Sequence, residues 1–566
     1  MTDIEIEQRH RGDNRWRVLG ALGLALFLVA LDSTVVSMSL PVIIADVGLS
    51  LTQAQWVSAV YAVVFAALLI TAGWFGDRLG RRALIMTGVV LIMAGSLIAA
   101  AANEPSVLIW GRIVQGIGGA GVLPGALATA GVVFSGRERR LVYTAWAAVI
   151  CAAAVLGPLL GGWLSTSFTW PWIFLVNLPI GVVVLIGIAV FVPETRSGQP
   201  AHGSDVDGFL LGTAGFALVM FALIEGQAYG WWRPLRAWRG LGIHWSSRAG
   251  ASPIPLLLVL GIILLALFLL WEQHRRQVDR AALLDFSLLG RPSVRWGSAA
   301  ALAVAVVVFG LLFTLPLYLV YVRGLTALRG GLVLMAISLG AGAATIVTLR
   351  AGWPAGPVWS VRLGLAIQTL SIAVTAIFLT DRTPMAWLVV LLVCYGIGLG
   401  LASAQLPRAI LAGMPADTSE RVSMTPSTVH KIGAALGVAI LGGVLSISLG
   451  QALSDRLTQV HGLSPVAAHE AVAATRDSAG AAIPVLRAHH ASHLVTDALA
   501  RGFADAFRAT LIAAVVLLLL GFCAATRIPL RATRIPQEPA SADPAAESAP
   551  DKPEGDAAVN SLDDSE

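Results

Sequence analysis

The sequence Gly73-Trp-Phe-Gly-Asp77-Arg78-Leu-Gly80-Arg81-Arg82 joins two long apolar runs, at residues 53–75 and 82–102. A hydrocarbon layer of about 30 Å needs about 20 apolar residues per helix, and each run is long enough. Arginines are expected to stay on the cytoplasmic side of a membrane. Asp77 would stand beside the N-terminus of the second helix, where the helix dipole favours a negative charge. The stretch therefore predicts a short cytoplasmic connection between two membrane spans.

The same pattern repeats along the 566 residues, of which 57% are hydrophobic and 13% are charged. A soluble domain carries about 25% charged residues, so one soluble core is excluded. The apolar runs do not alternate in polarity as barrel strands do, so each is predicted to be a helix. The sequence thus predicts an all-α integral membrane protein of about fourteen spans, centred on residues 18–40, 53–75, 82–102, 106–133, 140–164, 171–192, 208–229, 253–272, 297–321, 329–349, 361–380, 386–411, 426–450 and 506–526.

The basic residues predict the orientation. All 38 are arginine except Lys431 and Lys552. The arginines gather after spans 2, 4 and 8, so these loops and both termini are expected in the cytoplasm of a bacterium, with the chain multi-pass in its inner membrane. Short clusters between apolar runs argue against nucleic-acid binding. The connection at 230–250 is rich in arginine and tryptophan although it should be external, and we expect it at the membrane interface.

Two polar segments stand apart from the spans. Residues 453–503 are predicted to form a polar outer loop with helix-compatible stretches. Residues 527–566 have too few large apolar residues to bury a core, so a disordered acidic tail is expected. The three cysteines lie far apart inside apolar runs and form no disulfide or zinc pattern, so no metal site is expected from them. A histidine cluster in the outer loop is a weaker alternative for a metal, formed by His489, His490 and His493.

Charged residues inside the spans are candidates for function, because an ionised group at mid-bilayer costs about 3 kcal/mol or more. Asp32 lies in span 1 and Arg112 lies near the start of span 4. Burial disfavours a charged carboxylate, so Asp32 could exchange a proton or meet a cationic ligand. The alternatives are that Asp32 only pairs with a neighbouring helix and that Arg112 reaches an interface.

Further candidates surround a possible substrate cavity. Glu225, in span 7, could be a second acidic contact for a cationic substrate or an interfacial carboxylate. Span 2 carries three candidates for the cavity wall, Gln55, Trp56 and Tyr61. Small residues allow close helix packing and a proline bends a helix, so span 5 has a candidate hinge at Gly157, Pro158, Gly161 and Gly162.

Four motifs together resemble the major facilitator superfamily, specifically its fourteen-span drug/proton antiporter branch. The resemblance covers residues 20–450 and is strongest over the first six spans. Its motifs are Leu31-Asp32-Ser-Thr-Val-Val-Ser37-Met-Ser-Leu-Pro41 on span 1, the stretch 73–82, Arg112-Ile-Val-Gln115-Gly116 on span 4, and Gly157-Pro158 with Gly161-Gly162 on span 5. The span-1 motif departs at Ser37, where asparagine is usual. In the second half, His430-Lys431 replaces the usual arginine-glutamine pair before Gly433.

The resemblance implies two six-helix bundles that rock about a midplane site, with spans 7 and 8 inserted between them. It implies that Asp32 carries the proton, with Arg112 as its partner, and that Gly157 and Pro158 form a bend. The implied conformational latch consists of Gly73, Asp77, Arg78, Gly80, Arg81 and Arg82. The domains would be a segment at 1–17, bundles at 18–192 and 291–526, a linker with the inserted pair at 193–290, and the tail at 527–566.

The implied function is proton-coupled export of small lipophilic or cationic organic compounds, that is, multidrug efflux by a transporter and not an enzyme. The proton gradient would drive it without a cofactor, and we expect a monomer. One alternative is export of an endogenous product such as a lipid, a siderophore or a self-made antibiotic. A proton-coupled importer and a membrane enzyme or sensor are others, although no nucleophile elbow, paired catalytic carboxylates or Walker A sequence is present.

Overall fold

The computed structural model of this chain describes residues 3–134, 136–195, 205–240, 243–248, 250–278, 290–351, 356–411, 425–461, 463–489 and 492–529. Within these residues fourteen helices are long and apolar enough to cross a membrane, so the predicted number of spans is confirmed. The all-α class is confirmed as well, because the described part of the chain contains only one short two-stranded sheet besides its helices.

The helices form two groups with a pair between them in the sequence. The first group is α1 (Asp3–Val47), α2 (Leu51–Leu79), α3 (Arg81–Ala100), α4 (Pro105–Val133), α5 (Gly136–Ser167), α6 (Trp172–Leu175) and α7 (Asn177–Phe191). The inserted pair is α8 (Val206–Tyr229) and α9 (Pro253–Gln277), joined through β1 (Trp238–Gly240) and β2 (Ile243–Trp245). The second group is α10 (Pro292–Leu317), the π-helical turn η2 (Tyr318–Val322), α11 (Ala327–Ala351), α12 (Pro357–Phe378), α13 (Met385–Leu411), α15 (Thr425–Leu457), α16 (Pro465–Asp477), α17 (Ala482–Ala488) and α18 (His493–Thr526).

Local sequence explains where several of these helices begin. Ser50 and Gln53 form a capping box at the start of α2, in which each side chain bonds the other's backbone. Ser252 caps α9 through the backbone N–H of Ile254. Helices α4, α9, α10 and α12 each begin with proline in the first turn, where its missing N–H has no helical partner to lose.

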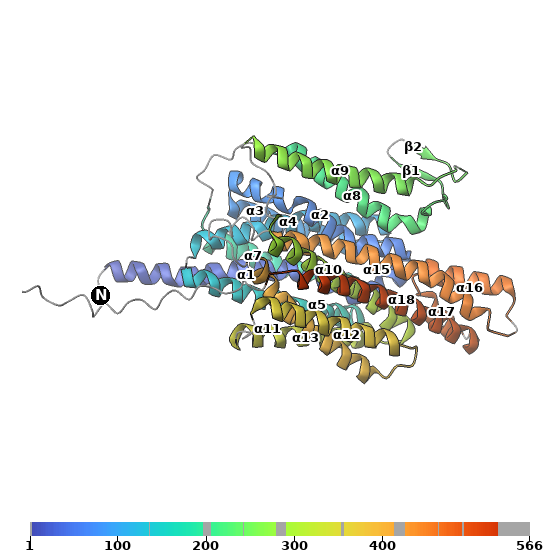
Figure 1. Cartoon of the computed structure of the whole chain (residues 1–566). Helices are drawn as coiled ribbons and strands as arrows, with labels where there is room; N and C mark the ends of the chain where they lie inside the picture. The colour runs from blue at the N-terminus through green and yellow to red at the C-terminus, as the bar shows by residue number, and fades with distance from the viewer. Residues whose placement is uncertain are drawn as a thin grey trace, which may run out of the picture.

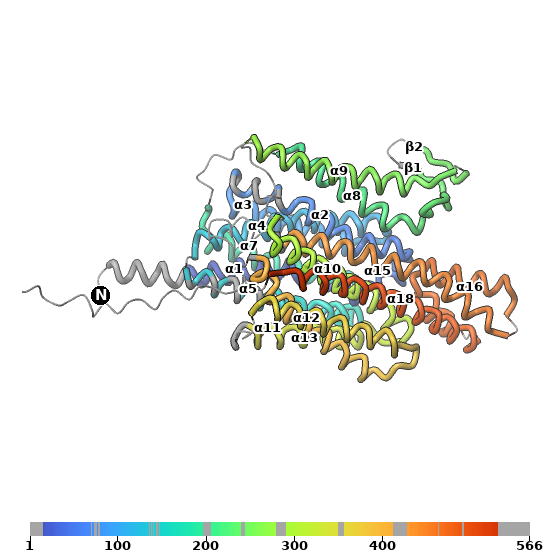
Figure 2. The backbone as a smooth tube through the Cα atoms, viewed as in Figure 1, coloured from blue at the N-terminus to red at the C-terminus, as the bar shows by residue number. Residues whose placement is uncertain are grey.

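Each group packs into a bundle. In the first bundle α3 lies against α4, α1 against α5 and α7, and α2 against α4. In the second, α11 and α12 lie against α13, while α10, α12 and α15 lie against α18. The main contacts across the boundary between the bundles join α5 to α11, α2 to α15, and α1 to both α10 and α11. Figure 2 shows the two bundles as parallel sets of tubes. This is the predicted architecture of two six-helix bundles with an inserted pair.

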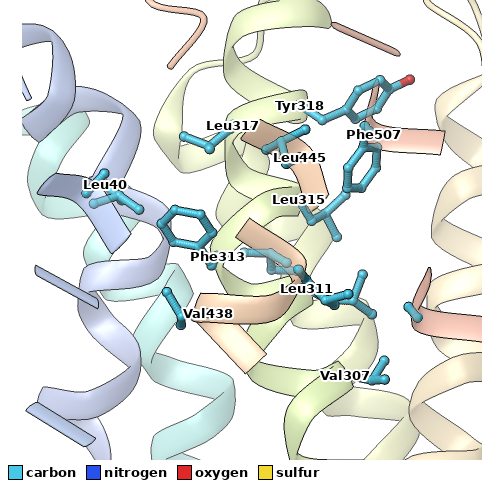
Figure 3. Packing of buried hydrophobic residues seen from close by; sticks show 14 of the residues in the cluster. Leu40, Val307, Leu311, Phe313, Leu315, Leu317, Tyr318, Val438, Leu445 and Phe507 are labelled. Atoms are coloured by element: carbon cyan, nitrogen blue, oxygen red, sulfur yellow. The ribbon is translucent and has the colours of Figure 1, made fainter. Parts of the chain in front are cut away.

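The hydrophobic core joins the bundles toward one end of the molecule. One buried cluster contains residues of both bundles and takes its α1 members from Val35 to Ile44. Figure 3 shows this packing, with Leu40 of α1 beside Phe313 of α10 and Val438 of α15. A second cluster takes its α1 members from Val18 to Val29 and consists of residues from α1 to α7 and Val192. The bundles therefore share a core at the end that carries α16 and α17, far from the N-terminus (Figure 1).

Tyrosines of η2 strengthen this shared end. The Tyr321 hydroxyl donates a hydrogen bond of 2.7 Å to the carbonyl of Pro41, which joins η2 to α1 of the other bundle. Tyr318 donates to the Thr380 carbonyl and stacks on Phe507 with ring centroids 5.0 Å apart. A π-helical turn changes the register of a helix, and η2 is such a turn that contains both of these tyrosines.

The inserted pair lies at the outside of the assembly. Only 11% of the most apolar stretch of α9 is buried, so most of this helix is available to lipid. Helix α8 lies between α9 and the bundles and contacts both α2 and α15 (Figure 1). The connection expected at the membrane interface is a hairpin in which Trp238 pairs with Trp245.

The polar segment at 453–503 is mostly helical, in keeping with the helix-compatible stretches of its sequence. Helix α15 continues to Leu457 and α18 already begins at His493, while α16 and α17 lie between them. Arg456 and Asp505 form an ion pair of 2.8 Å between the two extended helix ends. This ion pair lies beyond the predicted spans at 426–450 and 506–526, so both helices continue past the apolar length that hydropathy measures.

Candidate functional site

The structure brings Asp32 and Arg112 together inside the first bundle. The Arg112 Nη1 atom lies 3.1 Å from Asp32 Oδ2, and the two side chains are 2% and 0% exposed. Arg112 also donates to the backbone carbonyls of Asp32 and Val57, at 3.4 Å each. A buried charge of this kind is tolerated only when it is paired and hydrogen-bonded, and both conditions are met here.

Two amide side chains complete the shell of the carboxylate. Asp32 Oδ1 accepts a bond of 2.7 Å from Gln115 Nε2 and one of 2.8 Å from Asn177 Nδ2. Both amides also donate to the Ser96 hydroxyl, and Arg112 donates to the Gln115 carbonyl oxygen at 2.8 Å. Asn177 is placed by the break between α6 and α7, because it is the first residue of α7. Four helices therefore converge on one carboxylate.

Glycines on α3 and α4 allow this convergence. A Cβ on Gly95 would lie 2.7 Å from the backbone nitrogen of Gln115, and one on Gly111 would lie 2.7 Å from that of Ala99. Gly116 approaches the Tyr61 carbonyl of α2 in the same manner, at 2.9 Å. Small residues that let helix backbones approach closely are typical of membrane bundles, and here they set the depth at which Arg112 meets Asp32.

Tyr61 connects this shell to the second bundle. The Arg112 guanidinium carbon lies 4.5 Å from the centroid of the Tyr61 ring. The Lys431 ammonium of α15 lies 5.5 Å from the same ring and 4.2 Å from the Phe65 ring. Such contacts contribute about 0.5 to 2 kcal/mol each, depending on desolvation. A chain of contacts thus runs from Asp32 through Arg112 and Tyr61 to Lys431, across the boundary between the bundles.

The other cavity candidates lie apart from Asp32. Gln55 is fully buried and donates to the Val438 carbonyl of α15 at 3.3 Å. It therefore joins α2 to α15, and this contact is one of the seams between the bundles. Trp56 Nε1 donates to Glu225 Oε1 at 2.8 Å, which joins α2 to α8. Phe221 lies next to Trp56, with centroids 6.2 Å apart. The structure therefore brings Glu225 to Trp56 and not to the Asp32 shell.

The stretch between α2 and α3 is bound to the ends of neighbouring helices. Arg82 Nη2 donates to the Ala189 carbonyl of α7 at 2.6 Å, and its backbone N–H donates to Glu194. Arg81 Nη1 donates to the Ala128 carbonyl of α4 at 3.1 Å. Gly80 has φ of +112°, and a Cβ there would lie 2.5 Å from Glu194 Oε1, so glycine is required.

The remaining latch candidates are less defined. Arg78 is exposed in the last turn of α2, and the surroundings of Gly73 and Asp77 lie outside what the structure describes.

The second bundle repeats part of the arrangement between α2 and α3. Arg362, near the start of α12, donates to three carbonyls at the end of α18, those of Ala525, Thr526 and Ile528. Arg82 in the first bundle and Arg362 in the second each lie against the carbonyl end of a helix, where a cation is favoured.

The span-5 motif lies where α5 meets its neighbours. A Cβ on Gly157 would overlap the side chain of Thr34, and one on Gly161 would overlap the backbone of Val35. Gly162 packs in the same way on Ala327 of α11 in the second bundle. Across this seam, a Cβ on Gly331 would lie 2.6 Å from the carbonyl of Pro158. The motif thus forms a backbone contact with α1 and across the bundle boundary.

Sequence reasoning missed three polar residues of the shell, Ser96, Gln115 and Asn177, as candidates. Gln115 stood in the span-4 motif and three residues from Arg112, so helical spacing could have placed it on the same face. Ser96 and Asn177 carried no such signal. Lys431 was noted as a departure from the related motif, and its signal was the presence of a lysine inside a span.

Comparisons with known proteins agree with this architecture. A family model described as the Major Facilitator Superfamily matches residues 22–450. The chain is 29% identical to the multidrug efflux pump LfrA of Mycolicibacterium smegmatis, over 76% of this chain and 81% of that protein. It is 26% identical to the tetracenomycin C resistance and export protein of Streptomyces glaucescens, over 92% and 94%, and 29% identical to the probable actinorhodin transporter of Streptomyces coelicolor, over 77% and 73%.

A solved structure shares the fold. It is a bacterial homologue of the human lysosomal transporter Spinster, in an inward-facing and unoccupied conformation, with a TM-score of 0.61. The match covers 92% of this chain and 99% of that one at 18% identity. At this level of identity the likeness concerns the fold alone.

Proposed function

Because this chain belongs to the major facilitator superfamily, we propose that it exports small lipophilic or cationic organic compounds by alternating access, in exchange for protons. The curated relatives support export of drugs or antibiotics, since they are named as a multidrug efflux pump and as antibiotic exporters. The observation that carries proton coupling is the Asp32 shell. It holds one carboxylate by an arginine and two amides at a point completely shielded from solvent.

A proton that binds Asp32 would change the contacts between the helices around it. A proton on Asp32 removes the charge that Arg112 neutralises, so the ion pair weakens. Arg112 also packs on Tyr61 of α2, and α2 contacts α15 of the second bundle. A change at Asp32 therefore reaches the seam at which the bundles rock, and protonation favours one arrangement of the seam.

The driving force is sufficient without ATP. One charge that crosses 100 mV releases about 2.3 kcal/mol. Since each 1.4 kcal/mol corresponds to a factor of about ten, one proton sustains a gradient of more than tenfold for a neutral substrate. We place the chain in a bacterial inner membrane as a monomer, with both termini cytoplasmic and with bundles at 18–192 and 291–526.

The test is efflux from energised cells that produce the protein. Cells are loaded with a fluorescent lipophilic cation, and its loss is followed with and without an uncoupler. Efflux that stops when the uncoupler is added is the expected result. Uncoupler-resistant efflux would refute proton coupling, and an absence of efflux with the protein in the membrane would refute cation export.

A second candidate function is export of a compound that the source cell itself makes. The names of two relatives favour it, since one is a tetracenomycin C export protein and the other a probable actinorhodin transporter. Metabolite analysis of culture medium and cell extract from a strain that lacks the gene distinguishes this candidate, because one secreted compound would fall in the medium and accumulate inside the cells.

A further inference from the structure

The charge of Asp32 is not available to a ligand in this structure. Its side chain is 0% exposed, and both oxygens are occupied, Oδ2 by Arg112 and Oδ1 by Gln115 and Asn177. The ion pair with Arg112 is also neutral as a unit. A ligand between the bundles therefore meets other charges first.

Lys431 presents such a charge at the bundle boundary. It is half-buried on α15, and its ammonium lies 4.2 Å from the Phe65 ring and 5.5 Å from the Tyr61 ring of the first bundle. Among the described residues no ion pair joins it to a carboxylate, and the Asp32 charge acts on it only through space. Contacts with aromatic rings offset only part of the free energy of desolvating an ammonium, so a negative partner would be favourable there.

His430 extends this surface by one residue. Its side chain is exposed. Its ring lies edge-on to Phe309 of α10, with centroids 5.2 Å apart and an interplanar angle of 72°. One turn of α15 thus carries an ammonium beside two rings of α2 and an exposed imidazole beside a ring of α10.

We propose that Lys431 and His430 form a subsite for the acidic group of an aromatic substrate, a carboxylate or a phenolate. The ammonium of Lys431 pairs with the negative oxygen, the His430 imidazole donates a hydrogen bond to it, and Phe309 contacts the ring of the substrate. The proposal rests on the proposed function and adds acidic aromatic compounds to the range of exported molecules. A cationic group gains nothing from this turn of α15, because the nearest unpaired charge has the same sign.

Binding to the purified full-length protein tests the subsite. Radiolabelled naphthoate and its uncharged amide, naphthamide, are compared by scintillation proximity for the wild type, Lys431→Gln and Lys431→Arg. We expect the wild type to prefer naphthoate, Lys431→Gln to lose about tenfold in affinity for naphthoate with little change for naphthamide, and Lys431→Arg to restore most of the loss. The matched control is Arg295→Gln, which removes a cation 5.1 Å from the Trp296 ring at the exposed start of α10 and should change neither ligand.

Two outcomes would overturn the subsite. One is equal affinity of the wild type for acid and amide, and the other is an equal loss of both ligands in Lys431→Gln, which would mean a structural role. A different result would refute the proposed function while leaving the subsite in place. In proteoliposomes, naphthoate that binds through Lys431 but is not moved by a pH gradient would support the subsite and refute proton-driven export.

Discussion

The Asp32 carboxylate and the Arg112 guanidinium are 3.1 Å apart and belong to helices that begin about a hundred residues from each other. Their side chains share a shell with two amides, and that shell is closed to solvent. Among the described residues of the first bundle, these two side chains are the charged ones that are fully buried, and bonds from neighbouring helices meet at them.

Replacing the carboxylate should separate transport from the proton gradient. Asp32→Asn keeps the shape and the amide contacts but holds no exchangeable proton, so we expect pH-gradient-driven uptake into proteoliposomes to fall to background while insertion is unchanged. The matched control is Glu104→Gln, the same change at an exposed acid at the start of α4, which should behave as the wild type. Coupled transport by Asp32→Asn at the wild-type rate would refute the role of Asp32.

The aromatic ring between Arg112 and Lys431 should matter more than its hydroxyl. Tyr61→Phe keeps the ring and loses one bond of 3.3 Å to the Val29 carbonyl, whereas Tyr61→Leu removes the contacts with both cations. A contribution of about 0.5 to 2 kcal/mol predicts a several-fold lower transport rate for Tyr61→Leu and a nearly normal rate for Tyr61→Phe. Equal impairment of the two variants would assign the effect to the hydroxyl and contradict the proposed path.

The seam between α5 and α11 should open when a methyl group is added to it. Gly331→Ala places a Cβ 2.6 Å from the Pro158 carbonyl, while Gly342→Ala, on the same helix, meets nothing within 4 Å. Overpacking of about 1 to 3 kcal/mol should raise the population of the separated state about tenfold. Spin labels at Ser167 and Arg329, introduced through cysteines in a background without native cysteines, report this population by pulsed electron resonance.

The control variant decides how that experiment is interpreted. Gly342→Ala should give the distance distribution of the parent protein. If both alanine variants shift the distribution equally, helix propensity and not the contact at Pro158 would be the cause.

Gly80 should be the least replaceable glycine of the latch. Gly80→Ala combines an unfavourable φ of +112° with a Cβ 2.5 Å from Glu194 Oε1, whereas Gly48→Ala has a φ of +71° and open space. We expect a fall of a few kcal/mol in the free energy of unfolding for Gly80→Ala and about 1 to 2 kcal/mol for Gly48→Ala. Thermal unfolding in detergent measures both, and equal effects would show that the contact with Glu194 contributes nothing.

Glu225 should act as an attachment point for the inserted pair. Glu225→Gln keeps an oxygen that accepts the bond from Trp56 Nε1, so stability and cation efflux should stay close to those of the wild type. Trp56→Phe leaves the carboxylate without this donor, and we expect a loss of about 1 to 3 kcal/mol in stability. A selective loss of cation transport in Glu225→Gln would instead assign Glu225 to substrate binding.

The sequence predicted the spans and the charged pair for physical reasons that need no tertiary information. Apolar length fixes a span, and the high free energy of an ionised group in lipid singles out Asp32 and Arg112. The uncharged members of the shell could not be found in this way, because Ser96 and Asn177 are ordinary polar residues whose helix rotation is unknown from sequence. Their role depends on the close approach of α3 and α4 at Gly95 and Gly111, which is a property of the packed bundle.

The position of the inserted pair was also beyond sequence reasoning. The sequence indicated that Glu225 lies in a span, but not which face of α8 meets which helix. The Trp56–Glu225 bond depends on that docking, as does the ion pair of Arg456 and Asp505 that lengthens α15 and α18. Long-range contacts of this kind join residues that are far apart in the sequence, and no local pattern encodes them.

The contact of α8 with both α2 and α15 makes the two sides of the transporter unequal toward the membrane. Because α8 is bonded to α2 through Trp56, we expect it to move with α2 and to slide along α15 when the bundles rock. The opposite seam, α5 with α11, is formed by glycines that touch backbone directly. If substrates enter from the bilayer, we expect the inserted pair to obstruct a sideways path on the α8 side, so that entry on the side of α5 and α11 is preferred.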